Sequence, residues 1–217
     1  MTQIKPFFYN PDGRIFHGVW GVDRGFTYGD FRNLKTDDEK FIHFKERLDG
    51  LYINGVKDIT HPFSKAVMTC IGCDVLGQVF FGFDSSKNHS ITENTIKIFE
   101  ELDPTNLRRG IELEFRNNYE GRLNIRSPLK PTWHYSHVFN HGLRNSYIHS
   151  FRPFGIILND TLNSFIEIKN EEGCIVVNPD KFWEAFYVFY QTKFDELIND
   201  HSSPYRISAK IYLESFV

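Results

Sequence analysis

Residues 66–83 read AVMTCIGCDVLGQVFFGF and form a long apolar stretch that approaches the length of a membrane span. Asp74 and Gln78 lie inside this stretch. An acid near the middle of a span costs about 2.5–3.5 kcal/mol on insertion, which disfavours a membrane location. The stretch therefore predicts a helix that is buried in the core of a soluble protein, with the other helices packed around it and no membrane as a partner.

The composition of the 217-residue chain favours one domain with a sizeable core. Apolar residues make up 41% and charged residues 24%, which excludes a disordered or fibrous chain, and the 22 phenylalanines predict a core built largely from aromatic rings.

The formal charge of −3 argues against a protein that coats nucleic acid electrostatically, but it allows a small local phosphate site. Three cysteines form no even disulfide framework, and the first ten residues lack the apolar run of a signal peptide. We therefore expect a cytoplasmic protein.

Helix signals surround the apolar stretch. Residues 36–39 read TDDE, which is a capping-box sequence, and residues 90–93 read SITE, which is a second one. Asn178-Pro179-Asp180 supplies an N-cap, a proline at the first helical position and an early acid. Together with phased apolar stripes, these signals predict helices at residues 36–52, 62–82, 91–103, 105–119, 133–151 and 179–199.

The pattern changes between the last two predicted helices. Short strands are predicted at residues 156–158, 164–169 and 174–177, with turn residues between them. The tail at residues 206–217 roughly alternates and predicts an edge strand. Residues 1–35 are rich in glycine and aromatic residues without helical spacing, which predicts an N-terminal extension that wraps the body. The predicted fold class is therefore mainly α, with one helical domain at residues 36–217 and a small β insert at about 155–178.

Cys70 and Cys73 form a C-x-x-C pair. Such a pair acts in redox chemistry when it opens a helix, because the helix N-terminus stabilises the thiolate. Here the pair lies in the middle of the predicted apolar helix, where a thiol stays protonated. Cys174 is the only other cysteine, so no second pair completes a zinc site. Core packing is the favoured interpretation, and redox and metal roles are the weaker alternatives.

Histidines are dense around residue 140. On a helix, His134, His137 and His141 share one face, so three imidazoles have the spacing to converge on a metal ion. No carboxylate accompanies them between Thr132 and Phe151. We therefore favour a partly paired polar helix face and predict no metal site and no cofactor, with metal binding as the open alternative.

The sharper candidate for chemistry is the stretch HGLRNSYIHSF at residues 141–151. Arg144 can hold a phosphate through two hydrogen bonds and stabilise the charge of its transition state. A histidine with an ordinary pKa of about 6.5, such as His149, can move protons at neutral pH. Together the two side chains suffice for metal-free attack of a ribose 2′-OH on the adjacent phosphate. On an ideal helix they lie about 140° apart, so a shared site needs fraying near His149 or a second copy of the chain.

The sequence LRNSYIHSF at residues 143–151 resembles the signature of the HEPN superfamily, in which an arginine and a polar residue precede a histidine by four to six intervening positions. The stretch CIGCDVLGQVFFG around Asp74 resembles the acid-bearing helix of the same bundle. The resemblance covers about residues 62–190. It implies an all-α, HEPN-like helical bundle, to which the β insert and residues 1–35 are additions.

The resemblance also implies site residues and a function. The implied catalytic set is Arg144, His149, Asn145, Ser146 and Asp74, and the implied substrate-binding set is His141, Tyr147 and Arg152. Many members resemble metal-independent ribonucleases of prokaryotic toxin–antitoxin and defence systems, and they act as dimers that bring two motifs together. We therefore expect an endoribonuclease with an RNA substrate, a homodimer, and an antitoxin or another protein as a candidate partner. The alternative is a non-catalytic HEPN-like module that binds a partner protein or a nucleotide.

Overall fold

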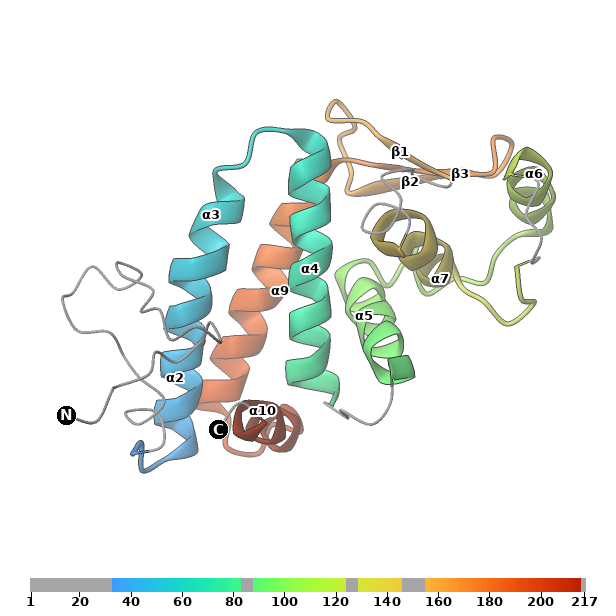
Figure 1. The fold of residues 1–217 in the computed structure, drawn as a ribbon. Helices are drawn as coiled ribbons and strands as arrows, with labels where there is room; N and C mark the ends of the chain where they lie inside the picture. Colours follow the sequence, from blue (N-terminus) through green and yellow to red (C-terminus); the bar gives the residue numbers. More distant parts are fainter. Residues whose placement is uncertain (1–32, 83–87, 124–128, 146–154, 216–217) are drawn as a thin grey trace.

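The computed structural model describes residues 33–82, 88–123, 129–145 and 155–215 (Figure 1). They form helices and one small sheet, which confirms a mainly α fold with a β insert. The elements in chain order are α2 (Asp37–Leu48), the π-helical turn η1 (Asp49–Ile53), α3 (Asn54–Lys57), α4 (Pro62–Phe81), α5 (Asn88–Leu102), α6 (Leu113–Leu123), α7 (Tyr135–Phe139), the π-helical turn η2 (Asn140–Asn145), β1 (Ile156–Leu158), β2 (Ile166–Lys169), β3 (Cys174–Val177), α9 (Pro179–Asn199) and α10 (Tyr205–Glu214). Residues 1–32 of the expected N-terminal extension lie outside the described residues.

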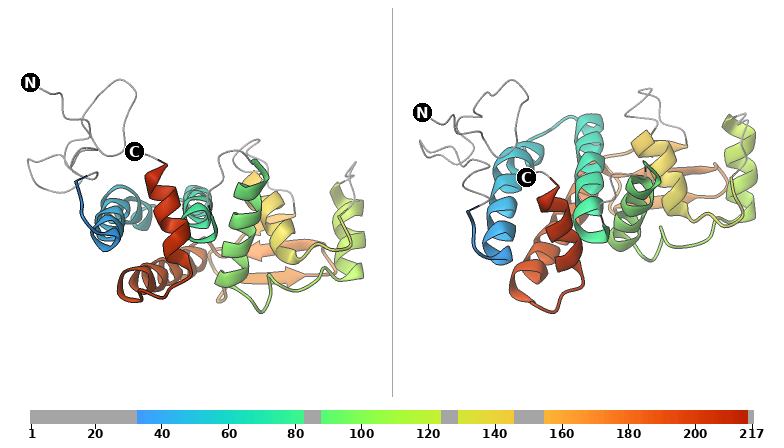
Figure 2. Two further views of the ribbon diagram at one scale, coloured as in Figure 1. Left: turned by 90° about the horizontal axis from the view of Figure 1, so that it is seen from below. Right: turned by 60° about the horizontal axis from the view of Figure 1, so that its bottom comes forward.

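The helices are arranged as a row with a second layer on one side. The row contains α2, α4, α5 and α7, and α9 and the sheet lie on one side of it (Figure 2, left). α10 crosses the end of α4, and α6 lies at the far end of the sheet (Figure 1). This arrangement gives α4 neighbours on several sides.

α4 is the central helix. Pro62 occupies its first position, and Gly82, with a φ of +109°, follows its last residue. α5, α9 and α10 pack against it, so Ala66 and Cys70 are fully buried. α4 is long and apolar enough to cross a membrane, but 56% of its most apolar window is buried inside the protein. The prediction of a buried core helix at this stretch is therefore confirmed.

Aromatic rings join the layers. Phe80 of α4 packs edge to face on Phe194 of α9, with 5.5 Å between the ring centroids. Phe99 of α5 packs in the same way on Phe139 of α7 at 4.9 Å. Edge-to-face pairs align the positive edge of one ring with the negative face of the other. The core is therefore rich in rings, as the composition predicts.

The first described helix has the expected capping box. Thr36 Oγ1 accepts a hydrogen bond from Glu39 N (3.2 Å), and the Glu39 carboxylate accepts one from Thr36 N (3.1 Å). The helical path continues beyond the expected residue 52 through η1 into α3. Tyr190 of α9 donates its hydroxyl to Asp49 Oδ1 (2.8 Å), at the first residue of this π-helical turn. The contact ties the turn to the second layer.

The predicted edge strand at residues 206–217 is wrong, because most of this stretch lies in α10. Its apolar residues fit an alternating pattern as well as a helical one. The buried side chains Ala209, Tyr212 and Leu213 follow helical spacing, whereas Ile207 is 72% exposed. Packing against α4 therefore selected the helical pattern.

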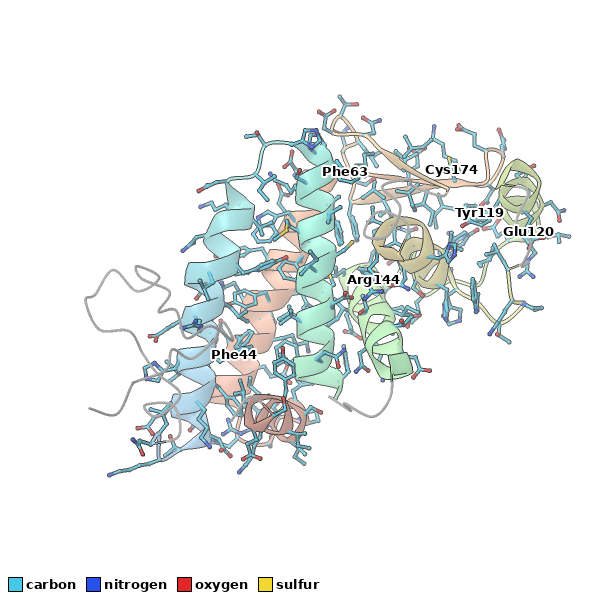
Figure 3. All side chains as sticks on the ribbon, viewed as in Figure 1. Phe44, Phe63, Tyr119, Glu120, Arg144 and Cys174 are labelled. Atoms are coloured by element: carbon cyan, nitrogen blue, oxygen red, sulfur yellow. The ribbon has the colours of Figure 1, made fainter. Side chains whose placement is uncertain are left out.

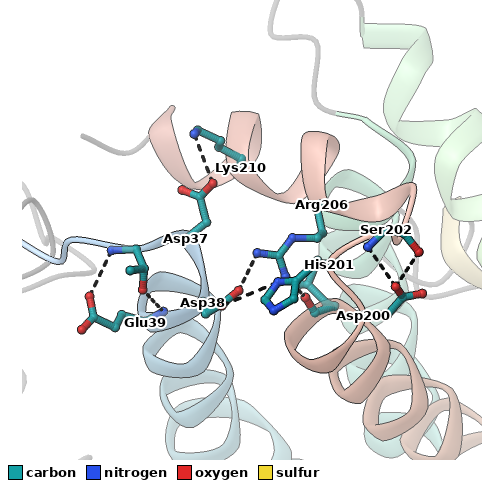
Figure 4. A network of polar contacts seen from close by, with 10 residues as sticks. Asp37, Asp38, Glu39, Asp200, His201, Ser202, Arg206 and Lys210 are labelled. Atoms are coloured by element: carbon teal, nitrogen blue, oxygen red, sulfur yellow. Dashed lines mark hydrogen bonds and ion pairs between the residues drawn. The ribbon is translucent and has the colours of Figure 1, made fainter.

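Ion pairs attach α10 to the beginning of α2. Asp38 contacts Arg206, and Asp37 Oδ2 accepts a hydrogen bond from Lys210 Nζ at 3.1 Å (Figure 4). Arg206 also donates through Nη1 to the backbone oxygen of Leu197, at the end of α9. These contacts hold α10 beside the beginning of α2, although the two helices are far apart in the sequence.

The helix that we expected at residues 105–119 corresponds to α6, which begins at Leu113 instead of residue 105. Asp103 Oδ1 accepts a hydrogen bond from Asn106 N (3.1 Å), which stabilises a turn instead of a helix. The following backbone pairs with the segment that leads into α7, where Tyr135 N donates to Arg109 O (3.0 Å). These non-local bonds use backbone groups that a helix would need, so α6 begins only after them.

The remaining helix predictions agree with the structure over the described residues. α9 has the predicted bounds, and α4 and α5 differ from theirs by one to three residues at their ends. The expected helix at residues 133–151 corresponds to α7 and η2 over residues 135–145, and residues 146–151 lie outside the described part of the chain.

β3 is the central strand of the sheet, whose order is β1-β3-β2. β1 runs parallel to β3, with Ile156 opposite Ile175, and β2 runs antiparallel to it, with Ile166 opposite Val177. All four residues of β3 are buried. The predicted strands at 156–158 and 174–177 match β1 and β3, and β2 is shorter than predicted.

Gly173, in the turn between β2 and β3, has a φ of +58° and packs against α6. A Cβ atom there would lie 2.3 Å from Tyr119 N. We expect Gly173→Ala to lower the free energy of unfolding by about 2–4 kcal/mol, through left-handed strain and the backbone clash. Gly55 of α3 has open space around it, so Gly55→Ala is the matched control and should raise that free energy by about 0.5–1 kcal/mol. Urea unfolding measures both changes, and a Gly173→Ala variant as stable as the wild type would contradict this packing.

Candidate functional site

Asp74, halfway along α4, forms an ion pair with Arg144 of η2. Arg144 Nε donates to Asp74 Oδ2 at 3.0 Å, and Arg144 Nη2 lies 2.9 Å from the same oxygen. Each side chain is 19% exposed. Figure 3 shows Arg144 where α4 and α5 meet. The expectation that Asp74 turns toward the motif helix and pairs there is therefore confirmed, whereas its role in catalysis stays a prediction.

Thr95 of α5 completes this site. Its hydroxyl donates to Asp74 Oδ1 at 2.6 Å, so both carboxylate oxygens have partners. Three elements, α4, α5 and η2, therefore meet at one carboxylate, and we call Asp74, Thr95 and Arg144 the Asp74 site. Sequence reasoning missed Thr95, because the hydroxyl and its acceptor are 21 residues apart and no local spacing relates them.

The backbone around Arg144 departs from an ordinary α-helix. α7 passes directly into η2, whose hydrogen bonds follow the wider i to i+5 pattern. Wide turns of this kind occur frequently at functional sites. η2 contacts both α4 and α5, which brings Arg144 to the Asp74 site.

The two cysteines of the C-x-x-C pair lie inside the core next to this site. Cys70 and Cys73 are free and fully buried. Burial raises the pKa of both thiols well above the ordinary value, and the negative charge of Asp74 raises them further. The thiols therefore stay protonated, which agrees with core packing as the favoured interpretation.

A second polar cluster lies where α5 meets the beginning of α7. It consists of Glu100, His134 and His137, each of which offers one ligand atom within 4.8 Å of the others, and we call it the Glu100 cluster. Glu100 Oε1 lies 3.1 Å from His134 Nδ1 and accepts a hydrogen bond from Ser136 Oγ at 2.8 Å. The carboxylate comes from another helix, so a search of the sequence around the histidines does not find it.

The histidines of this cluster are held in defined positions. His137 Nδ1 accepts a hydrogen bond from His134 N at 3.2 Å. Trp133 stacks on the His137 ring, with 5.5 Å between the centroids. Burial lowers the pKa of His137, and neighbouring His134 lowers it further, so His137 is neutral at pH 7. His141 lies outside the cluster, and partial burial of its ring lowers its pKa.

The other expected site residues cannot be placed next to the Asp74 site. Asn145 is the last residue of η2, and its side chain lies outside the described part of the structure. Ser146, Tyr147, His149 and Arg152 also lie outside the described residues. The structure therefore brings together Asp74 and Arg144 from the predicted set, with Thr95 as an addition.

Comparisons with known proteins identify no relative. No protein-family model matches the chain, and neither a curated protein nor a solved structure matches it at a significant level.

The Asp74–Arg144 pair makes a testable contribution to stability. We expect Asp74→Asn to lower the free energy of unfolding by about 1–3 kcal/mol, because it removes the charged partner of a largely buried arginine. Glu184→Gln is the matched control, since Glu184 and its partner Lys181 are 58% and 43% exposed, and it should cost less than about 1 kcal/mol. Chemical denaturation of Asp74→Asn, of Arg144→Met and of the double variant that carries both changes gives the coupling energy. Additive effects of Asp74→Asn and Arg144→Met would show that the pair contributes nothing to stability.

Proposed function

We propose that the protein is a HEPN-like endoribonuclease that cleaves RNA without a metal ion. The observation that supports this most strongly is the contact between Asp74, on the predicted acid-bearing helix, and Arg144, the arginine of the predicted motif. The resemblance implies that these two short stretches belong to one site, although Asp74 and Arg144 are 70 residues apart in the sequence.

The Asp74 contact suits Arg144 for holding a phosphate. Nε and Nη2 of its guanidinium contact one carboxylate oxygen, which fixes the plane and the direction of the group. A guanidinium carries five N–H donors, so it can contact a carboxylate and a phosphate oxygen together. A preoriented cation loses little conformational freedom when it binds a phosphate. It also stabilises the charge that develops on the phosphate in the transition state.

His149 follows Arg144 by five positions in the sequence and lies outside the described residues. On an ideal α-helix this spacing separates two side chains by about 140°. A second copy of the chain is therefore the way in which we propose that Arg144 and His149 share one site.

The reaction needs only the substrate and these side chains. His149 takes the proton of the ribose 2′-OH, and the 2′ oxygen attacks the adjacent phosphorus. The bond from phosphorus to the 5′ oxygen breaks, and that oxygen takes up a proton, which gives a 2′,3′-cyclic phosphate and a free 5′-OH. Arg144 holds the phosphate, while Asn145 and Ser146 orient the histidine or the substrate. His141, Tyr147 and Arg152 contact the RNA.

Cleavage assays with purified protein test this proposal. The wild type should cleave mixed RNA in excess EDTA, leave DNA intact and yield 2′,3′-cyclic phosphate ends, because the nucleophile is the 2′-OH of the substrate. His149→Ala should lower the rate by about 10²–10⁴. Arg144→Lys should also lower it, because lysine keeps the charge but lacks the bidentate fork.

Matched controls separate a catalytic effect from contamination. His201→Ala and Arg109→Lys change exposed residues of the same types and should cleave like the wild type. Circular dichroism of every variant checks that it is folded. Equal cleavage by His149→Ala and the wild type, or loss of cleavage in EDTA by protein that is still folded, would contradict the proposal.

The alternative function is a non-catalytic HEPN-like module that binds a partner protein or a nucleotide. The low exposure of Asp74 and Arg144, 19% each, favours this alternative, because a pair with a purely structural role also has this geometry. It predicts no RNA cleavage by the wild type, with a loss of stability as the main effect of Arg144→Lys.

We also propose a two-fold homodimer with the motif helix at or beside the interface. A two-fold interface uses the same surface of both copies, so it brings two Arg144–His149 pairs to one cleft. Light scattering at high micromolar concentration should give twice the mass of the 25.5 kDa chain. A monomer under these conditions would contradict the proposed dimer.

A further inference from the structure

The Glu100 cluster has the residue types of a metal site. Two imidazoles and one carboxylate form a donor set that suits zinc and similar transition metals more than magnesium or calcium, which prefer oxygen ligands. His134 is the N-cap of α7 and His137 is in its first turn, and their ring centroids lie 5.8 Å apart. Glu100 approaches them from α5.

The distances fit this assignment. Ligand bonds of about 2.0–2.2 Å on a tetrahedral zinc ion place two ligand atoms about 3.4 Å apart. Glu100 Oε1 and His134 Nδ1 lie 3.1 Å apart, and the ligand atom of His137 lies within 4.8 Å of both. The three ligand atoms therefore lie close enough together to face one ion.

The surroundings of the cluster orient its members. Ser136 Oγ donates to Glu100 Oε1, and Trp133 stacks on His137 with 17° between the ring planes. Groups of this kind commonly fix the direction of metal-binding side chains. His134 is 41% exposed, so an ion can enter from solvent.

We propose that Glu100, His134 and His137 bind one divalent transition-metal ion of the zinc type. Three protein ligands leave the fourth position of a tetrahedral ion to water or to another ligand. The ion connects α5 to α7, and α5 carries Thr95 while α7 leads into η2 with Arg144. Metal binding therefore joins α5 to the beginning of α7 and takes no part in the chemistry proposed at the Asp74 site.

Metal titration of the full chain tests the site. Protein stripped with a chelator and dialysed should bind one Zn²⁺ per chain in isothermal titration calorimetry, and its melting temperature should rise with the Zn²⁺ concentration. Glu100→Gln and His134→Gln should each weaken Zn²⁺ binding more than about 100-fold, because even indirect partners of a metal ligand are worth 10- to 100-fold.

The neighbouring residues supply the controls. Glu101→Gln alters the next residue of α5, which is 40% exposed, and His201→Gln alters a histidine that is 74% exposed. Both should bind Zn²⁺ like the wild type. Equal weakening by the control variants, or no saturable binding of one ion by the wild type, would overturn the proposal.

A second measurement needs no substitution. Co²⁺ in a four-coordinate site gives intense visible absorption, whereas hydrated Co²⁺ absorbs weakly. Wild-type protein titrated with Co²⁺ should show the intense bands until one equivalent has been added, and Zn²⁺ should abolish them. Weak absorption of the hydrated type throughout would overturn the proposal. Neither experiment measures RNA cleavage, so the metal site and the proposed nuclease can fail independently.

Discussion

A carboxylate in the middle of an apolar core helix must be paired, and this constraint determines how the helices around α4 meet. An unpaired charge in that position costs several kcal/mol. Asp74 meets the requirement with a hydroxyl from Thr95 on one oxygen and the guanidinium of Arg144 on the other. Because these partners come from α5 and η2, the same carboxylate sets the position of both elements against α4. The predicted motif arginine is therefore part of the packing of the protein as well as a candidate for chemistry.

The two polar clusters occupy the same pair of elements. α5 carries Thr95 and Glu100, and the helical path from α7 to η2 carries His134, His137 and Arg144. Between the clusters, apolar contacts such as the Phe99–Phe139 ring pair hold α5 and α7 together. Polar contacts define the direction of the side chains, and ring packing supplies most of the apolar burial.

Local signals in the sequence predict the local parts of this structure. The capping box at Thr36, the N-cap at Asn178 and the apolar run of α4 each depend on residues that are neighbours in the sequence, and the structure contains all three. The errors arise where distant contacts decide. The tail packs as α10 because α4 covers one helical face of it, and α6 begins late because the preceding backbone pairs with the segment before α7. Of the candidate site, the Asp74–Arg144 contact was predictable from the two motifs, but Thr95 and Glu100 were not, since each contributes through a contact across 20 or more residues.

The order of the helices along the chain has a consequence for biosynthesis. α4 ends at Phe81 and is covered by α9 and α10, which begin only at Pro179 and Tyr205, and α10 is also attached to α2 by a contact across 173 residues. A ribosome that adds about 5–20 residues per second needs several seconds to make the intervening chain. During this time the apolar faces of α4 lack their final neighbours and are open to aggregation. Until the C-terminal helices emerge, α5 and η2 are among the neighbours already made that can cover α4.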